Sequence, residues 1–246
     1  MRAGGLRKEP DNSMTGRGEK YRKRIRQFKD EVSVYPVSCE RLAAGRTDEQ
    51  WLDEVLRGGA KIVQLRDKES SDRRLLEKAK YFRRKTFKAG ALFLVNDRID
   101  IALLSDADGV HLGQNDLPPE EVLKLAPEMI IGISCNTEDQ AKKLGEQEGQ
   151  GTLAASYYNI GPLFPTETKE GLSAFIGVEA IELFSSYLSL PFTVMGGIKR
   201  RHIKELVALG ARRIALVTAL TRAPDIAGET ARWKEEINLA RSETNG

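Results

Sequence analysis

The sequence predicts an α/β fold, specifically a single-domain (β/α)8 TIM barrel with a basic N-terminal extension. From residue 32 onward, short apolar segments alternate with amphipathic ones, and eight apolar segments occur. Such alternation implies parallel strands joined by helical crossovers, and eight units in roughly 215 residues match a barrel of this type. A doubly wound open sheet is the alternative. Residues 38–46 contain no glycine-rich G-x-G-x-x-G turn, which disfavours its dinucleotide-binding form.

Eight segments are predicted as strands. Most are β-branched or continuously apolar, as strands covered on both faces should be. In order they are residues 32–37, 61–66, 92–96, 109–112, 130–134, 154–160, 192–195 and 214–218.

Helix boundary signals lie between these segments. Residues 47–59 open with a T-x-x-Q capping box and end in Gly-Gly, while residues 117–127 carry a Pro-Pro pair at a helix start. Residues 136–147 begin with an Asn-Thr cap, and residues 200–210 end in glycine. These segments are the predicted crossover helices.

Charge divides the chain into a predicted basic extension, residues 1–30, and a catalytic barrel domain, residues 31–246. The extension holds ten Lys/Arg and four Asp/Glu, whereas the whole chain has a net charge of only +3. We interpret residues 1–30 as a flexible, solubilising segment. Its densest run, KYRKRIR at 20–26, would also suit an arm that binds nucleic acid or an anionic membrane, but we expect neither partner.

The remaining composition predicts a cytoplasmic protein. No stretch of 18 apolar residues occurs, and the first residues lack the pattern of a secretory signal. Cys39 and Cys135 are the only cysteines, which argues against a disulfide scaffold and fits a reducing compartment. His111 and His202 stand apart from any cysteine cluster, so no zinc site is predicted. The sequence leaves a homo-oligomer open.

Charged residues follow the predicted strands at their carboxyl ends, where barrel enzymes gather their catalytic groups. Asp97 and Asp116 come after neighbouring strands and supply the oxygen ligands that Mg²⁺ prefers. Arg66, Lys68 and Lys169 supply cations suited to an anion with several phosphate oxygens. Carboxylates and cations around one mouth predict a metal–diphosphate site.

A second set of strand-end residues predicts a monophosphate site. Gly196-Gly197 follows the seventh strand and Thr218 ends the eighth, where barrels recurrently bind phosphate through backbone N–H groups. Thr166 and Thr168 add hydroxyl donors on the loop after the sixth strand. Two phosphate sites in one cavity predict a transferase that joins two phosphorylated substrates.

Each of these residues alone has a simpler interpretation. Asp97 and Asp116 suit helix caps, and a Gly-Gly pair is commonly just a turn. We interpret His111 as a hydrogen-bonded wall residue and Cys135 as a small buried hydrophobe rather than a nucleophile. Compatible groups at six of the eight predicted strand ends favour the joint interpretation.

The same residues carry a resemblance to the thiamin phosphate synthase (thiamine-phosphate pyrophosphorylase) family. The segments VQLRDK, VNDRIDIALLSDADGVHLGQND, IGIS, IGPLFPTETK and MGGI stand in the family's order and spacing, over about residues 32–226. The resemblance implies condensation of 4-amino-2-methyl-5-hydroxymethylpyrimidine diphosphate with 4-methyl-5-hydroxyethylthiazole phosphate. It also implies a Mg²⁺ cofactor and a dissociative mechanism.

The resemblance further implies roles for the matching residues. Asp97 and Asp116 would bind Mg²⁺, and Gln64 would hold the pyrimidine. The diphosphate would contact Arg66, Lys68, Asn96, Ser134 and Lys169, of which Arg66, Lys68, Ser134 and Lys169 are the expected catalytic residues. Thr166 and Thr168 would lie on a closing loop, and the thiazole phosphate would contact Gly197, Val217 and Thr218.

Departures from the family pattern occur at Cys135-Asn136, at Asn159 and at Thr218, and they bear on substrate fit more than on reaction type. Two alternatives stay open. One is a thiazole tautomerase-like paralogue, which would rely on a histidine near the end of the fifth strand, where this chain has Asn136. The other is a non-catalytic, phosphate-ligand-binding regulatory barrel, which leaves Asp97 and Lys169 without a purpose.

Overall fold

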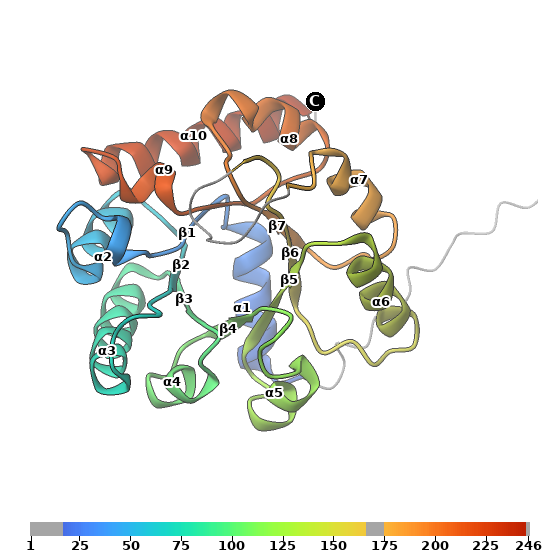
Figure 1. The fold of residues 1–246 in the computed structure, drawn as a ribbon, viewed down its shortest axis with the longest axis horizontal. Coiled ribbons are helices and arrows are strands. Elements are labelled where there is room, and N and C mark those ends of the chain that lie inside the picture. Colours follow the sequence, from blue (N-terminus) through green and yellow to red (C-terminus); the bar gives the residue numbers. More distant parts are fainter. Residues whose placement is uncertain (1–16, 166–174, 245–246) are drawn as a thin grey trace, which may run out of the picture.

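The computed structural model describes residues 17–165 and 175–244, and its centre is a sheet of eight parallel strands. From the second strand to the eighth, each strand pairs with the next one in the chain, and the eighth also pairs with the first. A parallel bridge between Val37 and Gln64 joins the remaining edges, so the sheet closes into the predicted barrel (Figure 1). The strands are β1 (Val34–Pro36), β2 (Ile62–Leu65), β3 (Leu92–Asn96), β4 (Gly109–Leu112), β5 (Ile130–Cys135), β6 (Tyr157–Ile160), β7 (Phe192–Val194) and β8 (Ile214–Leu216).

Helices surround the barrel, as Figure 1 shows. The capping box predicted at Thr47 is present, because its side chain accepts from the Gln50 N–H while the Gln50 side chain accepts from the Thr47 N–H. The helices are α2 (Asp48–Arg57), α3 (Asp72–Ala89), α4 (Ile99–Leu104), α5 (Pro119–Leu125), α6 (Glu138–Gly149), α7 (Glu179–Ser185), α8 (Ile203–Ala208), α9 (Thr218–Thr221) and α10 (Ile226–Thr244), with the short 3-10 turns η2 (Glu40–Leu42) and η3 (Arg200–His202).

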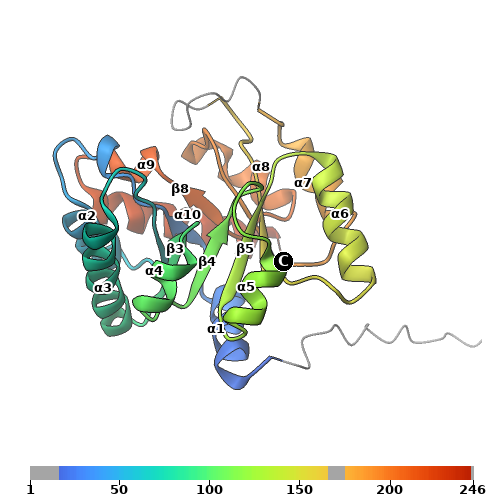
Figure 2. The ribbon, with the colours of Figure 1, turned by 60° about the horizontal axis from the view of Figure 1, so that its bottom comes forward.

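Helix α1 (Glu19–Asp30) corrects the expectation that residues 1–30 form one loose extension. Tyr21, Ile25 and Phe28 are buried against residues inside the barrel, and Figure 2 shows α1 beneath the end where the strands begin. The apolar positions 21, 25 and 28 form a helical stripe within the basic run, and this stripe seals the barrel floor. Residues 1–16 lie outside the described residues.

One basic residue of α1 is itself buried and paired. Arg24 donates to the Asp108 carboxylate at 2.9 Å and to the Glu128 carbonyl at 2.8 Å. At the other end of the helix, the Arg213 guanidinium donates to the carbonyls of Phe28 and Lys29. Part of the charge assigned to a solvated arm therefore anchors α1 to the barrel.

Strand alternation decides which side chains face the barrel interior. Ile62 of β2 and Leu92 of β3 pack inside with α1 near the floor, and every second residue above them also faces inward. This period of two places Gln64 and Asn96 inside the barrel, closer to the carboxyl ends. Intervening residues such as Val63 and Phe93 pack outward against the helices.

Six predicted strands differ from the observed ones at their ends, and two of them show the physical reason. The segment 214–218 leaves the sheet after Leu216, since α9 begins at Thr218, and the segment 154–160 joins it only at Tyr157. Apolar composition continues beyond the hydrogen-bonded ladder in both cases, so it overestimates strand length.

None of the helices in the described ranges is both long and apolar enough to cross a membrane. Both cysteines are buried and free. The cytoplasmic location and the open homo-oligomer stay predictions.

Candidate active site

The carboxyl ends of the strands surround a cavity of about 770 Å³. All predicted site residues within the described ranges line it: Gln64, Arg66, Lys68, Asn96, Asp97, Asp116, Ser134, Gly197, Val217 and Thr218. Thr166, Thr168 and Lys169 lie outside the described residues. The structure therefore brings together strand ends that are separated by up to about 150 positions in the chain.

Two carboxylates meet at this mouth. Asp97 follows β3 with a φ of 62°, which turns the chain sharply while its N–H still donates to the His111 carbonyl at 2.8 Å. Burial, and then interaction with the Asp116 carboxyl, raise the pKa of Asp97. Asp116 is held by its own loop, since one carboxylate oxygen accepts from the Gly113 N–H at 2.6 Å. The pair is thus fixed by backbone geometry.

Cations stand beside the carboxylates. The Lys68 ammonium lies 3.1 Å from Asp97, on the loop that follows β2. Arg66 lines the same cavity, and its N–H donates to the Ser38 hydroxyl at 3.1 Å. Within the described ranges no carboxylate pairs with the Arg66 guanidinium, which leaves this cation available to an anionic ligand.

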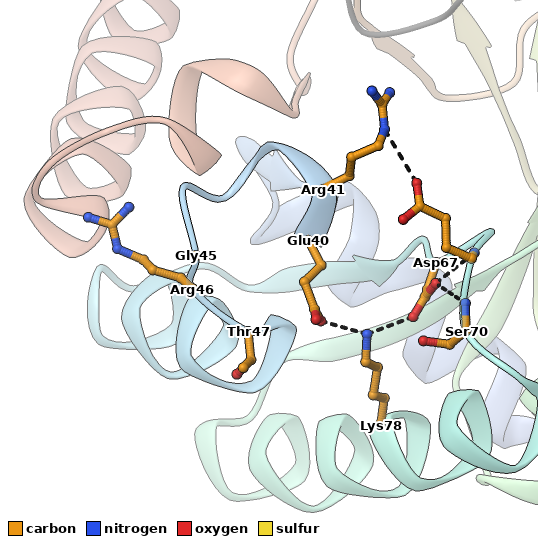
Figure 3. Close-up of a pocket in the computed structure, with 9 residues that line it drawn as sticks. Glu40, Arg41, Gly45, Arg46, Thr47, Asp67, Ser70 and Lys78 are labelled. Carbon is orange, nitrogen blue, oxygen red and sulfur yellow. Dashed lines mark hydrogen bonds and ion pairs between the residues drawn. The ribbon is translucent and has the colours of Figure 1, made fainter.

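Asp67, between these two cations, points away from the mouth into a separate cluster (Figure 3). The Lys78 ammonium, on α3, lies 2.6 Å from Asp67, 2.6 Å from Glu40 and 3.0 Å from Asp48. Although burial opposes the change, Lys78 and the N–H groups of Ser70 and Glu69 lower the pKa of Asp67. Lys78, which sequence reasoning missed, therefore ties two loops at the mouth to α3.

This cluster borders a smaller, open cavity of about 320 Å³, also drawn in Figure 3. Its walls come from the loop between β1 and α2 and from the loop after β2. Lys78, on α3, forms ion pairs with Glu40 of the first loop and with Asp67 of the second. The cluster explains why the loop after β2 alternates its charges: the acidic residue is anchored and the basic ones face the main cavity.

Glycines shape the opposite wall of the main cavity. Gly196 and Gly197 have φ values of +96° and +64°. A Cβ on Gly197 would lie 2.4 Å from the Pro165 carbonyl oxygen, so no larger residue fits without displacing the backbone. Val217 and Thr218, at the start of α9, follow the neighbouring strand β8 and line the same cavity. A glycine turn of this kind allows close approach of backbone N–H groups to an anion.

A chain of buried polar side chains crosses the barrel below the mouth. His111 contacts the Tyr157 hydroxyl through Nδ1 at 2.9 Å and the Ser134 hydroxyl through Nε2 at 3.1 Å. The Tyr157 hydroxyl lies 3.1 Å from that of Tyr35, which accepts from Gln64 at 2.9 Å. His111 is thus a hydrogen-bonded wall residue as predicted. Sequence reasoning missed the two tyrosines, although their inward position follows from strand alternation.

The residues that depart from the family pattern, Cys135, Asn136 and Asn159, each have a local structural role. Cys135 is buried, and this burial raises the pKa of its thiol to about 12, so it is not a ready nucleophile. The Asn136 amide donates to the Gly161 carbonyl. Asn159 accepts from the Thr193 hydroxyl at 2.7 Å within the barrel. None of these contacts displaces a carboxylate or a cation from the mouth.

Comparison with known proteins agrees with this geometry. A profile described as thiamine monophosphate synthase matches residues 34–220. The thiamine-phosphate synthase of Pelotomaculum thermopropionicum is 38% identical over 197 residues, covering 80% of this chain and 88% of the relative. That of Lawsonia intracellularis is 34% identical over 213 residues, covering 86% and 95%.

Solved structures add a match in three dimensions. Thiamine phosphate pyrophosphorylase from Pyrococcus furiosus superposes with a TM-score of 0.75 at 31% identity, covering 89% of this chain and all of that one. A 3-hexulose-6-phosphate synthase, at 16% identity and a TM-score of 0.57, covers 85% of this chain and 99% of its own, and shares the fold alone.

The profile spans more than half of the chain and includes every predicted site residue. The function and the transferase class predicted from the sequence are confirmed at the level of these relatives. The chain belongs to the thiamine monophosphate synthase family.

Proposed function

We propose that the protein joins 4-amino-2-methyl-5-hydroxymethylpyrimidine diphosphate to 4-methyl-5-hydroxyethylthiazole phosphate, forming thiamin phosphate and free diphosphate. The observation that carries the proposal is a single cavity lined by both of the predicted phosphate-binding sets. Arg66, Lys68 and the two carboxylates line it together with the Gly196–Gly197 turn and the start of α9. Its volume of about 770 Å³ suits two small phosphorylated molecules held against each other.

Asp97 and Asp116 fit the Mg²⁺ cofactor that we propose. Burial and the proximity of Asp116 raise the pKa of Asp97, and a divalent cation between the carboxylates would relieve their repulsion. The described residues contain no group of three or more Asp, Glu, His or Cys side chains that could hold a metal. Mg²⁺ does not need one, because it completes its shell with water and phosphate oxygens. When bound, it would neutralise charge on the departing diphosphate.

The polar residues around this pair would hold the diphosphate substrate. Arg66 and Lys68 would pair with its phosphate oxygens, and Asn96 and Ser134 would donate hydrogen bonds. Lys169 would add a further cation, from the family resemblance of its segment. Gln64, deeper in the barrel, would hold the pyrimidine ring.

The thiazole phosphate would bind at the other end. Gly197 and the backbone of Val217 and Thr218 would donate N–H groups to its phosphate. Thr166 and Thr168 would lie on a loop that excludes water from the reacting centre, as the resemblance implies.

The reaction that we propose is dissociative. The bond between the pyrimidine methylene and the diphosphate oxygen breaks, and its electron pair leaves with the diphosphate. The thiazole nitrogen then donates its lone pair to the resonance-stabilised cation and forms the new C–N bond. Such chemistry needs stabilisation of a leaving anion rather than a protein nucleophile. The high pKa of the buried Cys135 supports this choice, because that thiol is not ionised at neutral pH.

Two alternatives predict different outcomes. A thiazole tautomerase-like paralogue would isomerise a thiazole without consuming the pyrimidine diphosphate. A non-catalytic regulatory barrel would bind phosphorylated thiazole without turnover.

A coupled assay with the two defined precursors, run with and without EDTA, tests the proposal. We expect diphosphate release that requires both precursors and stops with EDTA, and turnover in Lys169→Ala reduced by about two orders of magnitude or more. Binding of thiazole phosphate without diphosphate release would overturn the proposed reaction. Turnover that persists in EDTA would overturn the proposed cofactor.

A further inference from the structure

The buried chain of polar side chains joins the two residues that the proposed function places on one substrate. It runs from Gln64 through Tyr35, Tyr157 and His111 to Ser134, with successive contacts of 2.9, 3.1, 2.9 and 3.1 Å. Gln64 comes from β2 and Ser134 from β5, so the chain crosses the barrel. Gly132 makes room for it, since a Cβ there would lie 2.2 Å from the Tyr157 ring.

Proton counting gives the chain a direction. The Gln64 amide nitrogen can only donate, so the Tyr35 hydroxyl accepts from it and has its own proton left for Tyr157. A hydrogen bond from Tyr35 to the Tyr157 hydroxyl is the direction that gives the Tyr35 proton an acceptor within this series of contacts, and the Tyr157 hydroxyl then donates to the Nδ1 atom of His111. In this direction a neutral His111 carries its single N–H at Nε2, which lies 3.1 Å from the Ser134 hydroxyl.

We propose that His111 is a positioning residue: held as the neutral Nε2–H tautomer, it donates to Ser134 and thereby leaves the Ser134 proton free for the departing diphosphate. This inference rests on the proposed function and names how one of its residues is oriented. With the opposite tautomer, the Ser134 hydroxyl would donate its hydrogen bond to Nε2, and only its oxygen lone pairs would face the anion.

The surroundings of His111 agree with a neutral ring. Its side chain is buried between β4, β5 and β6, and both ring nitrogens have hydroxyl partners. A doubly protonated ring would leave the Tyr157 hydroxyl with two donors and no acceptor for its own proton along this chain.

The tautomer is directly measurable, because the protein has only two histidines. We expect nitrogen-15 chemical shifts of histidine-labelled protein to show a protonated Nε2 and an unprotonated Nδ1 for His111, with His202 as the internal reference. In Tyr157→Phe, the loss of the donor to Nδ1 should shift or average these signals. A protonated Nδ1 in the wild type, or unchanged His111 signals in Tyr157→Phe, would overturn the inference.

Tyr157→Phe and Tyr158→Phe form a matched pair for the functional readout. Both tyrosines are buried on β6, but they face opposite sides of the strand, and the Tyr158 hydroxyl has no hydrogen-bond partner among the described residues. We expect Tyr157→Phe to weaken binding of inorganic diphosphate with Mg²⁺ by about tenfold, as for loss of an oriented hydrogen bond to an anion. The KM for thiazole phosphate should not change in either variant.

Equal diphosphate affinities in the two variants would overturn the positioning role. This holds whether both keep the wild-type affinity or both lose it to the same extent, since an equal loss would indicate only a packing effect. The nitrogen-15 measurement uses the protein without substrates. If the wild type fails to convert the precursors while His111 shows the expected tautomer, the proposed function fails and the order of the hydrogen-bond chain stands.

Discussion

Asp97 illustrates how a single residue is placed for chemistry. Its φ of 62° is unusual for a residue with a side chain and costs about 1 kcal/mol or more. Aspartate tolerates this conformation better than most residues. The turn moves the carboxyl from the strand direction to the cavity mouth, where Asp116 and Lys68 meet it. Backbone strain at such a position is typical of functional sites.

Asp97→Asn should therefore reduce kcat by about a hundredfold or more while the fold is retained, because the amide keeps the shape but loses the charge that would bind Mg²⁺. Steady-state kinetics at increasing Mg²⁺ concentration provide the measurement. Asp100→Asn is the control, since Asp100 pairs with Arg98 at the surface. Comparable rates in Asp97→Asn and Asp100→Asn would contradict the assignment of Asp97 as a metal ligand.

Gly197 makes a second prediction at this scale. Gly197→Ala should raise the KM for thiazole phosphate by about tenfold, because the added Cβ displaces the turn that would donate N–H groups to the phosphate. Gly210→Ala is matched to it, with a φ of +95° and open space around the position. That control should lose about 1–2 kcal/mol of stability without a kinetic effect. The reverse pattern, or equal KM values, would argue against a phosphate at Gly197.

At the scale of elements, Lys78 connects α3 to two loops of the mouth. Its side chain is 3% exposed, and those of Asp48 and Asp67 are 1% and 6% exposed. Three carboxylates around one buried ammonium are stable only as a set, because removing the cation leaves buried negative charges unpaired. By anchoring Asp67, the cluster fixes the position of the loop that carries Arg66 and Lys68 at the edge of the cavity.

Lys78→Met should reduce the free energy of unfolding by about 3–5 kcal/mol at neutral pH. Interaction with Lys78 lowers the pKa of Asp67 in the folded protein. The Asp67–Lys78 pair therefore contributes stability above the ordinary aspartate pKa, and this contribution is lost as the pH falls and Asp67 becomes protonated. The difference between wild type and variant should therefore shrink in acidic buffer. Urea denaturation at both pH values measures it.

Lys85→Met is the matched control on the same helix, since its ammonium pairs with Asp53 in solvent. We expect little change in its stability at either pH. A difference for Lys78→Met that is the same at neutral and acidic pH would show that lost packing, rather than unpaired charge, causes the destabilisation.

At the scale of the whole molecule, the two ends of the barrel have different tasks. Helix α1 fills the floor with Phe28, which lies in the same cluster as Tyr35 and Tyr157 and contacts the Tyr157 ring at 4.6 Å between centroids. The open end carries the cavity. Because Phe28 packs in one cluster with Tyr35 and Tyr157, helix α1 supports the hydrogen-bonded side chains beneath the cavity.

Phe28→Ala should cost about 3–5 kcal/mol of unfolding free energy, because it leaves a cavity where α1 meets the barrel. Phe87→Ala, at a position 75% exposed on α3, should change stability by no more than about 0.5 kcal/mol. Chemical denaturation of the two variants makes the comparison. Equal, small losses would mean that α1 is not part of the cooperative fold.

The sequence by itself determined the number of strands, the barrel class and the strand ends that carry the charged residues. Hydrophobic periodicity and turn residues are local properties, so they can be recognised without coordinates. The predicted residues of the described ranges, such as Asp97 and Ser134, accordingly lie around one cavity.

Only the tertiary structure decided three other features: the seal formed by α1, the Lys78 cluster and the hydrogen-bond chain through His111. The contacts of Tyr35 with Tyr157 and of Arg24 with Asp108 join residues 122 and 84 positions apart. No local pattern encodes such pairs, because their energies depend on distance and burial after the barrel has closed. The basic segment was interpreted as solvated and the two tyrosines were missed, because only packing places their polar atoms beside specific partners.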